Sequence, residues 1–348
     1  MSLSTEHCMP HKTIYTTERS AFHQQRALAA APPDLDITVL RQPNRETLRA
    51  ALADAEYLIS ERVGVINSDL IAAAPKLKLI LRLGSLAHDI DLDAARAADV
   101  IVCYWPDVGV IRVAEHVMML MLALAKRLND VQSIALAASP EWRESRRTDE
   151  NTFAYNWSGR QGITQLYQRS VGILGFGEIG AELAQRLAGW EVTLLYHKRR
   201  RLPLTVETQL GLTYIDRDAL ITQSDYLVNL LPYSQETHMS LDARTLAHMK
   251  PGAFIVSCGS GGVIDEGALA DALRAGQLAG AALDTYDWEP LRLDNPLIAL
   301  AKADYNVVLT PHTAGGSPTA DSGADERRAA YTNIVRHLHD QPLLHRLT

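Results

Sequence analysis

The glycine-spaced segment from Gly175 to Gly180 constrains the fold of this chain more than any other feature. It has the pattern G-x-G-x-x-G and lies between an apolar run, VGIL, and a helix-compatible run, AELAQRLAG. In a strand–turn–helix unit these glycines permit a tight bend, a close approach of backbone to phosphate and close helix–strand packing, and the helix N-terminus attracts the phosphates. We therefore expect dinucleotide contacts from Gly175, Gly177, Glu178, Ile179 and Gly180. A glycine-rich turn without a ligand is the alternative.

Strand-like and helix-like runs alternate on both sides of this segment. Four strands are predicted in the first part of the chain, at 14–16, 36–40, 55–60 and 77–83, with a helix at 45–53. Six more are predicted from Ser170 onward, namely SVGILGF, EVTLLY, YLVNLLP, AFIVSC, AGAALD and NVVLTPH. Such alternation is typical of parallel sheets covered by helices, and six strands are what a dinucleotide-binding sheet needs.

The remaining segments suggest how the domains are joined. Residues 112–128 are apolar on most sides, which predicts a helix buried between two bodies. Residues 138–168 are predicted to be irregular, and the amphipathic segment 325–338 is expected to return to the first domain. We therefore predict an α/β fold with two Rossmann-like or flavodoxin-like domains, each a doubly wound parallel sheet, and a cleft between them. The substrate domain comprises 1–107 plus 318–348, and the dinucleotide-binding domain comprises 108–317.

Composition excludes several other classes of protein. The chain of 348 residues has a net charge of -7, which argues against nucleic acid as a main partner. Its three cysteines, Cys8, Cys103 and Cys258, are too few and too scattered for a disulfide framework or a zinc site, so no metal is expected. The longest apolar run, Val117–Ala125, is far shorter than the roughly 20 residues that span a bilayer. With no apolar signal core at the N-terminus, we expect a cytoplasmic protein without a membrane partner.

The residues that follow the second strand of the predicted dinucleotide domain are basic. A carboxylate that binds the adenosine ribose is expected near His197, since 197 − 175 = 22, but the sequence there is HKRRR. A carboxylate would repel a 2′-phosphate, whereas lysine and arginine attract it. We therefore favour NADP over NAD, with His197, Lys198 and Arg199 at the cofactor. A solvated basic loop is the alternative.

Six ordered motifs resemble those of the D-2-hydroxyacid dehydrogenases, a family that includes phosphoglycerate, glyoxylate and formate dehydrogenases. They are GSLAHDIDLDAA (84–95), VAEH (113–116), GFGEIG (175–180), MKPGAFIV (249–256), GGVIDEGALADALRAGQLAGAALDTYDWEP (261–290) and LTPHTAGG (309–316). The resemblance runs from about Leu77 to Gly316. It implies two α/β domains, a nicotinamide cofactor between them, a small-molecule substrate and a homodimer formed mainly through the cofactor domains.

The resemblance also implies a catalytic pair, His312 and Glu289, with the family's separation of 312 − 289 = 23 residues. An imidazole beside a carboxylate can give or take the hydroxyl proton during hydride transfer. Asp284 is expected near the nicotinamide carboxamide. A strand-end histidine, a surface carboxylate and a structural cap are the respective alternatives. The resemblance further places Leu231, Pro232, Cys258, Gly259 and Gly315 at the cofactor, and Leu86 and Ala87 at the substrate.

One catalytic position departs from the family pattern. An arginine directly precedes GG-x-[VI]-D-E in the family, but Ser260 stands there, and no Arg or Lys lies between Lys250 and Arg274. In the family that arginine binds the substrate carboxylate with two hydrogen bonds and polarises the carbonyl, which serine cannot do. Gly109, where many relatives have Asn, and Ser85-Leu86, in place of Val-Gly, are further departures.

Three accounts of Ser260 stay open. The substrate lacks the usual 2-oxo carboxylate, or another cation binds it, or the chain is an inactive NAD(P)-binding regulator like the corepressor branch of the family. Arg112 is the best candidate for that cation, and the weaker ones are Arg62, Arg146, Arg147 and Arg160. The retained His312 and Glu289 favour an oxidoreductase that acts on the CH–OH group of a 2-hydroxyacid or a related compound. The aromatic residues of 146–167 predict either a dimer arm that narrows the cleft or packing on their own domain; they are Phe153, Tyr155, Trp157 and Tyr167.

Overall fold

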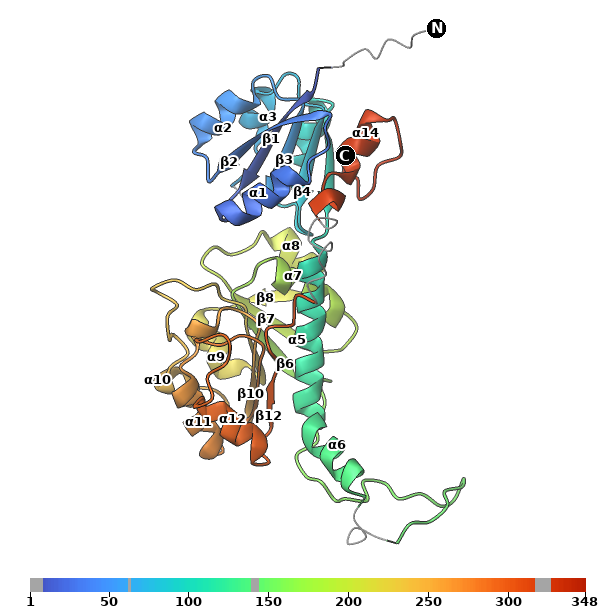
Figure 1. Cartoon of the computed structure of the whole chain (residues 1–348), viewed down its shortest axis with the longest axis vertical. Helices are drawn as coiled ribbons and strands as arrows, with labels where there is room; N and C mark the ends of the chain where they lie inside the picture. Colours follow the sequence, from blue (N-terminus) through green and yellow to red (C-terminus); the bar gives the residue numbers. More distant parts are fainter. Residues whose placement is uncertain (1–8, 62–63, 139–143, 317–326) are drawn as a thin grey trace. The chain divides into compact units, whose positions relative to one another are not determined.

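The computed structural model describes residues 9–61, 64–138, 144–316 and 327–348 (Figure 1). The chain forms two compact units. Unit 1 comprises Met1–Val108 and Ser317–Thr348, and unit 2 comprises Gly109–Gly316. Unit 1 is therefore built from both ends of the sequence, whereas unit 2 is continuous.

Unit 1 contains a five-stranded parallel sheet in the order β2-β1-β3-β4-β5. This is the flavodoxin-like order, in which the chain reverses direction across the sheet after β2. The strands are β1 (His11–Thr17), β2 (Leu35–Arg41), β3 (Tyr57–Glu61), β4 (Leu79–Leu83) and β5 (Ile101–Trp105). The helices are α1 (Ala21–Ala29), α2 (Arg45–Leu52), α3 (Ser68–Ala72), α4 (Leu92–Ala97) and α14 (Thr332–Leu338). The four predicted strands are confirmed, and β5 is an addition.

Successive residues of these strands enter two separate cores, because side chains alternate between the faces of a sheet. Ile14 packs with the helices α2, α3 and α4 on one face, whereas Tyr15 packs on the other face with Ala27 of α1. Tyr331 and Ile334, at the start of α14, belong to this second core. The predicted return of the C-terminal segment to the first domain is therefore confirmed, although residues 325–326 lie outside the described residues.

Residues 345–348 cover the outer edge of β5. The backbone N–H of Tyr104 donates to His345 O at 3.1 Å, and that of Leu347 donates to Val102 O at 2.8 Å. These bonds satisfy groups that an edge strand would otherwise expose.

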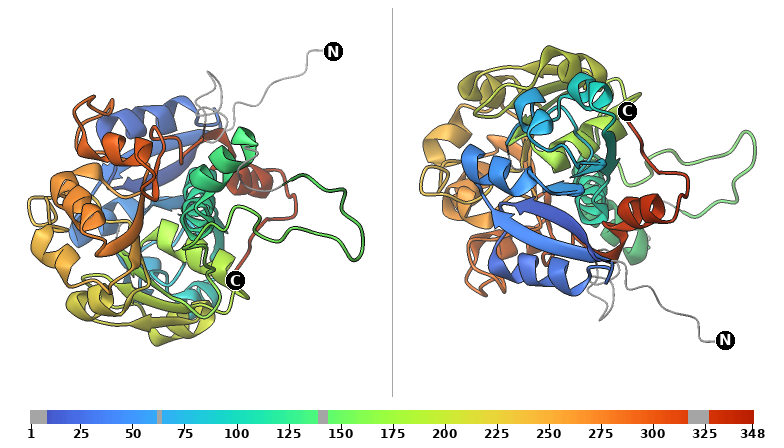
Figure 2. Two further views of the ribbon diagram at one scale, coloured as in Figure 1. Left: turned by 90° about the horizontal axis from the view of Figure 1, so that it is seen from below. Right: turned by 90° about the horizontal axis from the view of Figure 1, so that it is seen from above.

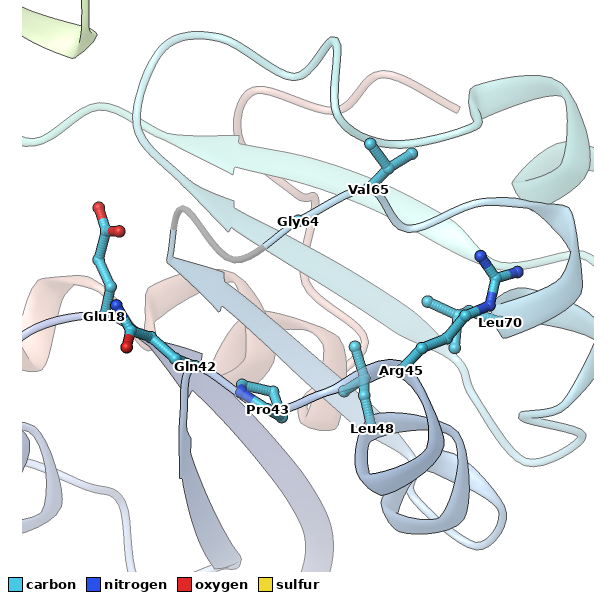
Figure 3. Close-up of a pocket in the computed structure, with 8 residues that line it drawn as sticks. All are labelled: Glu18, Gln42, Pro43, Arg45, Leu48, Gly64, Val65 and Leu70. Atoms are coloured by element: carbon cyan, nitrogen blue, oxygen red, sulfur yellow. The ribbon is translucent and has the colours of Figure 1, made fainter.

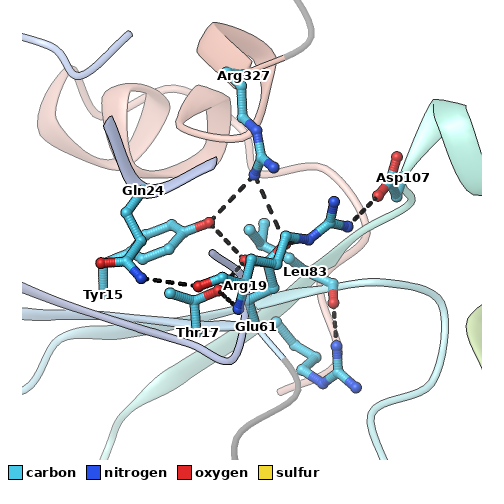
Figure 4. A network of polar contacts seen from close by, with 9 residues as sticks. Tyr15, Thr17, Arg19, Gln24, Glu61, Leu83, Asp107 and Arg327 are labelled. Atoms are coloured by element: carbon cyan, nitrogen blue, oxygen red, sulfur yellow. Dashed lines mark hydrogen bonds and ion pairs between the residues drawn. The ribbon is translucent and has the colours of Figure 1, made fainter. Parts of the chain in front are cut away.

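A polar network gathers at the carboxyl ends of β1 and β3 (Figure 4). The buried carboxylate of Glu61 accepts hydrogen bonds from Thr17 Oγ1 at 2.6 Å and Tyr15 OH at 3.1 Å, and it pairs with Arg19 Nε at 2.7 Å. Burial raises the pKa of Glu61, but the charge of Arg19 and these hydrogen bonds outweigh burial and hold it below its usual value. A pocket near the same edge of the sheet (Figure 3) is lined by Glu18, Gln42, Pro43, Arg45, Leu48, Gly64, Val65 and Leu70.

Unit 2 contains a seven-stranded parallel sheet in the order β12-β11-β10-β9-β6-β7-β8. The strands are β6 (Ser170–Leu174), β7 (Thr193–His197), β8 (Leu212–Tyr214), β9 (Tyr226–Asn229), β10 (Ala253–Ser257), β11 (Leu278–Leu283) and β12 (Val307–Leu309). The six predicted strands are present, and the expected total of six is corrected to seven by the short strand β8. The direction of chain progression reverses between β6 and β9, and ligands of open α/β sheets bind at the carboxyl side of such a point.

The helices of unit 2 begin with a long apolar one, α5 (Val108–Lys126), followed after Arg127 by α6 (Leu128–Ala137). The predicted helix at 112–128 therefore starts four residues earlier. The others are α7 (Glu178–Leu187), α8 (Leu204–Leu210), α9 (Arg217–Gln223), α10 (Ala243–Ala247), α11 (Glu266–Arg274) and α12 (Pro296–Lys302). By length and composition alone, α5 is the one helix among the described residues that could cross a membrane, a test that core helices of soluble proteins also pass.

Helix α6 and the following segment leave the body of unit 2 (Figure 2). No residue of α6 is buried, and the described residues 144–168 contain neither helix nor strand, as predicted. Leu136, Phe153 and Tyr155 in this stretch are more than 70% exposed.

Candidate functional site

The glycine turn lies between β6 and α7. Gly175 has φ +90, and a Cβ atom there would lie 2.7 Å from the backbone nitrogen of Leu231. A Cβ on Gly180 would lie 3.0 Å from the ring of Phe176, whereas one on Gly177, the N-cap of α7, would meet nothing within 4 Å. The turn is therefore tightly packed at Gly175 and Gly180 and open at Gly177, which fits a phosphate-binding helix N-terminus.

The ends of β9 and β10 lie beside this turn. A Cβ on Gly259 would lie 2.7 Å from the carbonyl oxygen of Leu231, the residue that also contacts Gly175. Cys258, just before Gly259, is a free thiol whose pKa is raised by burial and by the charge of Asp284, so it stays protonated. The structure thus brings Gly175, Leu231, Cys258 and Gly259 together, with Pro232 following Leu231. This cradle of backbone at the switch point fits a dinucleotide.

His312 and Glu289 are in direct contact. His312 Nδ1 lies 2.6 Å from Glu289 Oε2, and Glu289 Oε1 accepts a hydrogen bond from the backbone N–H of Tyr286 at 3.0 Å. The His312 side chain is 60% exposed, and no partner of its Nε2 atom is found among the described residues. The pair can therefore exchange a proton with a small molecule through Nε2.

Asp284 organises the loop that carries His312. It is fully buried, and its carboxylate accepts hydrogen bonds from Thr310 Oγ1 at 2.6 Å and from the backbone N–H groups of Thr313 and Ala314 at 2.9 Å. Its carbonyl oxygen also accepts the N–H of His312 at 2.9 Å. These contacts match the structural alternative for Asp284; the expected contact with the nicotinamide carboxamide stays a prediction.

Two residues of this loop region escaped the sequence analysis. His116 Nε2, on α5, lies 3.0 Å from Thr310 Oγ1 and 3.4 Å from Asp284 Oδ1. Tyr286 donates its hydroxyl to the carbonyl oxygen of Thr310 at 2.9 Å. The VAEH and DTYDWEP motifs contain both residues, but only the fold shows that they meet at Thr310.

Ser260, at the position of the family's arginine, links the turn after β10 to the segment after β9 by two hydrogen bonds. Its Oγ accepts the N–H of Tyr233 at 2.9 Å, and its own N–H donates to Leu231 O at 2.9 Å. A Cβ on the following Gly261 would lie 1.9 Å from the backbone of Tyr286. The turn after β10 is therefore wedged between its neighbours, and Ser260 brings no positive charge to it.

The basic segment after β7 is only partly available to a ligand. Arg201 makes two hydrogen bonds, at 2.8 and 2.7 Å, to the carboxylate of Glu207. His197 Nδ1 lies 3.1 Å from Ile215 O, and its ring stacks on Tyr214. Arg199 and Arg200 are exposed, with no ion pair or hydrogen bond to any described residue. Within the basic run 198–201, the charge of Arg201 is therefore compensated by Glu207.

The candidate substrate residues fall in both units. Leu86, which is buried, and Ala87 follow β4 in unit 1. Arg112, on α5, lies against Gly316, which ends the loop that follows β12 and carries His312. Gly315 directly precedes Gly316 in that loop. The weaker candidates offer less: Arg160 pairs with Asp130, Arg146 and Arg147 are exposed in the segment after α6, and Arg62 lies outside the described residues.

Comparisons with known proteins agree with this arrangement. Residues 118–314 match the model of the NAD binding domain of D-isomer specific 2-hydroxyacid dehydrogenases. Glyoxylate/hydroxypyruvate reductase B of Pectobacterium carotovorum is 35% identical over 289 residues, which cover 83% of this chain and 84% of that protein. A D-3-phosphoglycerate dehydrogenase of Mycobacterium tuberculosis is 32% identical over 295 residues, 85% of this chain but only 51% of that protein, so the chain spans about half its length.

The solved structures share the architecture. The PH0520 protein from Pyrococcus horikoshii aligns with a TM-score of 0.57 and 26% identity, covering 98% of this chain and 96% of that one. A D-mandelate dehydrogenase from Rhodotorula graminis, at 23% identity and a TM-score of 0.56, shows the same fold over 97% of this chain and 98% of that one.

Proposed function

Since the chain belongs to the D-isomer specific 2-hydroxyacid dehydrogenase family, we propose that it is an NAD(P)-dependent oxidoreductase that interconverts a 2-hydroxyacid, or a related hydroxy compound, and its carbonyl form. The contact between His312 Nδ1 and Glu289 Oε2 carries this proposal. It lies at the carboxyl edge of the same sheet that presents the glycine turn. A bound nicotinamide would supply or accept the hydride there.

The protein's own part in the reaction is proton transfer. In reduction, His312 Nε2 donates a proton to the carbonyl oxygen, and in oxidation it takes the hydroxyl proton back. Glu289 accepts the Nδ1–H, which fixes the tautomer and stabilises the imidazolium that exists before reduction and after oxidation. The anchors around Asp284 hold the backbone of this loop in place. A purely regulatory NAD(P)-binding protein does not need a pair of side chains that transfers a proton, so the presence of this pair favours an enzyme.

The cofactor we propose is NADP rather than NAD. Arg199 and Arg200 are exposed beside the end of β7, and the position of the ribose-binding carboxylate is held by His197. Two available guanidinium groups favour a 2′-phosphate, although Arg201 does not add to them.

We also propose that a second copy of the chain covers α6 and the segment after it. Several apolar side chains of α6 and of the described residues 144–168 are exposed, among them Leu136, Phe153 and Tyr155. Asn129 Nδ2 on α6 donates to Val307 O at 3.3 Å, but no residue of the helix is buried by its own unit, and exposed apolar side chains of this kind favour a partner surface. Light scattering after size-exclusion chromatography should give a dimer, and Leu136→Glu combined with Tyr155→Asp should give a monomer. A monomeric natural chain contradicts the proposal.

The function is tested by assaying 2-oxo acids, aldehydes and hydroxy ketones with both cofactors. We expect turnover of at least one carbonyl compound, with NADPH preferred. His312→Ala should lower kcat by roughly 10²–10⁴, the usual contribution of a general acid or base. His248→Ala, at an exposed histidine of the same unit, is the matched control. If no substrate turns over and cofactor still binds, the chain is the inactive regulator that was left open as the alternative.

A further inference from the structure

Glu289 lies on an exposed loop, so its place beside His312 depends on what holds that loop. The segment 284–295, between β11 and α12, contains neither helix nor strand. Residues 287–290 are exposed, and the Glu289 side chain is 35% exposed, so packing alone does not fix it. A carboxylate sets the tautomer of an imidazole only while it stays within hydrogen-bond distance of the ring.

One carboxylate holds both ends of the loop from Asp287 to Asn295. Glu266 Oε1 accepts the backbone N–H of Asp287 at 3.1 Å, and Glu266 Oε2 accepts a hydrogen bond from Asn295 Nδ2. A single side chain therefore closes this loop, and Glu289 lies between its two ends. Fixing both ends of a loop removes most of the conformations that its middle could adopt.

The two ends are themselves attached to packed helices. Glu266 begins α11 directly after the N-cap residue Asp265, and the buried residues of α11 belong to the core of unit 2. Asn295 is the N-cap of α12, where its Oδ1 accepts the N–H of Leu297 at 3.0 Å. Glu266 therefore links two helices whose positions are set by the core.

The surroundings of Glu266 disfavour an ionised carboxylate unless donors meet it. Its side chain is half-buried, and burial raises the pKa of Glu266, with the charges of Asp287 and Asp265 adding to this effect. The hydrogen bonds from Asp287 N and Asn295 Nδ2 oppose it. The ionised form is therefore favoured by the same two donors that close the loop.

Contacts inside the loop carry its position to the acid–base pair. The N–H of Tyr286, the residue before Asp287, donates to Glu289 Oε1 at 3.0 Å, and Glu289 Oε2 lies 2.6 Å from His312 Nδ1. Leu291 also packs against the core, but an apolar contact is non-directional and does not orient a carboxylate. A displacement of Asp287 would therefore move Tyr286 N and the carboxylate that faces His312.

From these contacts we propose that Glu266 is a positioning residue, which holds both ends of the loop 287–295 and so keeps Glu289 against His312 Nδ1. The neutral imidazole then carries its proton on Nδ1 and presents Nε2 for proton transfer. This proposal rests on the proposed function, because the position of Glu289 affects a rate only if the pair transfers protons.

Reversing the polarity of the bridge tests the proposal. Glu266→Gln keeps an acceptor for Asp287 N but turns an amide donor toward Asn295 Nδ2, and Asn295→Asp places a second carboxylate beside Glu266. In the double variant the amide at position 266 can donate to the carboxylate at position 295, which can still cap α12. We expect kcat to fall roughly 3- to 30-fold in each single variant and to recover in the double variant, with the KM for NADPH unchanged.

Nitrogen-15 NMR of the His312 ring gives a readout that does not need turnover. The signals are assigned by their loss in His312→Ala. At a pH where the ring is neutral, the natural chain should show the Nδ1–H tautomer alone. Glu266→Gln and Asn295→Asp should each show a mixture of both tautomers, and the double variant should return to one.

Two further variants separate positioning from folding. Asp225→Asn changes a carboxylate at the amino ends of β6 and β9, where it pairs with Lys250 Nζ at 3.0 Å, so it is the matched control and should leave kcat and the tautomer unchanged. If Glu266→Gln does not fold, Asn295→Ser removes the donor to Glu266 and keeps a side chain that can cap α12. It should again give a mixture of tautomers.

The outcomes distinguish this proposal from the function on which it rests. If Glu266→Gln lowers the urea midpoint but changes neither the tautomer nor kcat, Glu266 is a purely structural residue and the proposal is overturned. A mixture of tautomers already present in the natural chain overturns it as well. If no carbonyl compound turns over, the proposed function fails, whereas a single tautomer that depends on Glu266 still supports the positioning.

Discussion

The carboxylate of Glu289 bridges His312 Nδ1, at 2.6 Å, and the backbone N–H of Tyr286, at 3.0 Å. Glu289→Gln keeps the shape of the side chain but removes the charge that the imidazolium needs. We expect kcat to fall by on the order of 10- to 100-fold, because a lost charge-assisted hydrogen bond costs about 1.5–3 kcal/mol. Steady-state kinetics with the best carbonyl substrate measures this. Glu236→Gln, at an exposed site of the same unit, should be silent; an unchanged kcat in Glu289→Gln would remove Glu289 from the mechanism.

Ser260→Arg alone should have two separable effects. It removes the acceptor of the Tyr233 N–H, which should lower the free energy of unfolding by about 0.5–1.5 kcal/mol, measured by urea titration. It also adds a guanidinium, which should raise kcat/KM for glyoxylate and hydroxypyruvate if these are poor substrates. Ser260→Ala should share the loss of stability without the gain in activity. A gain in both variants would contradict this account.

Arg199→Ala should weaken NADPH binding and leave NADH binding unchanged. Losing one charged pair to a 2′-phosphate corresponds to about 1.5–3 kcal/mol. Fluorescence titration of both cofactors gives the ratio of affinities. Arg201→Ala is the informative comparison, because Arg201 is bound to Glu207 and should affect stability more than cofactor choice. Equal affinities in the natural chain would refute the preference for NADP.

The stability of unit 2 should depend on pH through Glu207. Hydrogen bonds from Arg201 and then from Tyr196 lower the pKa of this carboxyl from 4.5 to about 2. The folded-state pKa is depressed, so the stabilisation is fully present above the unfolded-state pKa and is lost as the pH falls toward about 2. The difference in urea midpoint between the natural chain and Glu207→Gln should therefore be constant near neutral pH and shrink below about pH 4.5. A pH-independent difference would contradict the assigned role.

Local pattern was sufficient to predict the glycine turn and most of the strands, whereas the His312–Glu289 pair was implied by the resemblance to the family. The missed strands, β5 and β8, are short: five and three residues. A run of three residues, as in β8, does not establish a clear alternation of apolar and polar residues, so pairing with a neighbour decides its state. Strand β5 is as long as β3 and β4, which were predicted, so its length does not explain why it was missed. The three residues of β8 become a strand only by pairing with β7.

Contacts across turns could not be predicted in the same way. Ser260 and Tyr233 are 27 residues apart, and His116 and Thr310 are 194 apart. Whether such side chains meet depends on the positions of whole strands and helices, which no local spacing encodes. Arg201 illustrates the same limit, because the sequence shows its charge but not that Glu207 neutralises it.

The division of unit 1 between the two ends of the chain has a consequence for synthesis on the ribosome. Unit 2, being continuous from Gly109 to Gly316, has all of its core side chains in one stretch and can close as soon as that stretch has emerged. The N-terminal strands are made first but lack Tyr331, Ile334 and the cover of β5 until residues 345–348 arrive. All five strands of unit 1 are complete by Trp105, but the sheet lacks this cover while the more than 200 residues from 109 to 316 are made. During that interval its open core and its uncovered edge are exposed, and a chaperone can bind them.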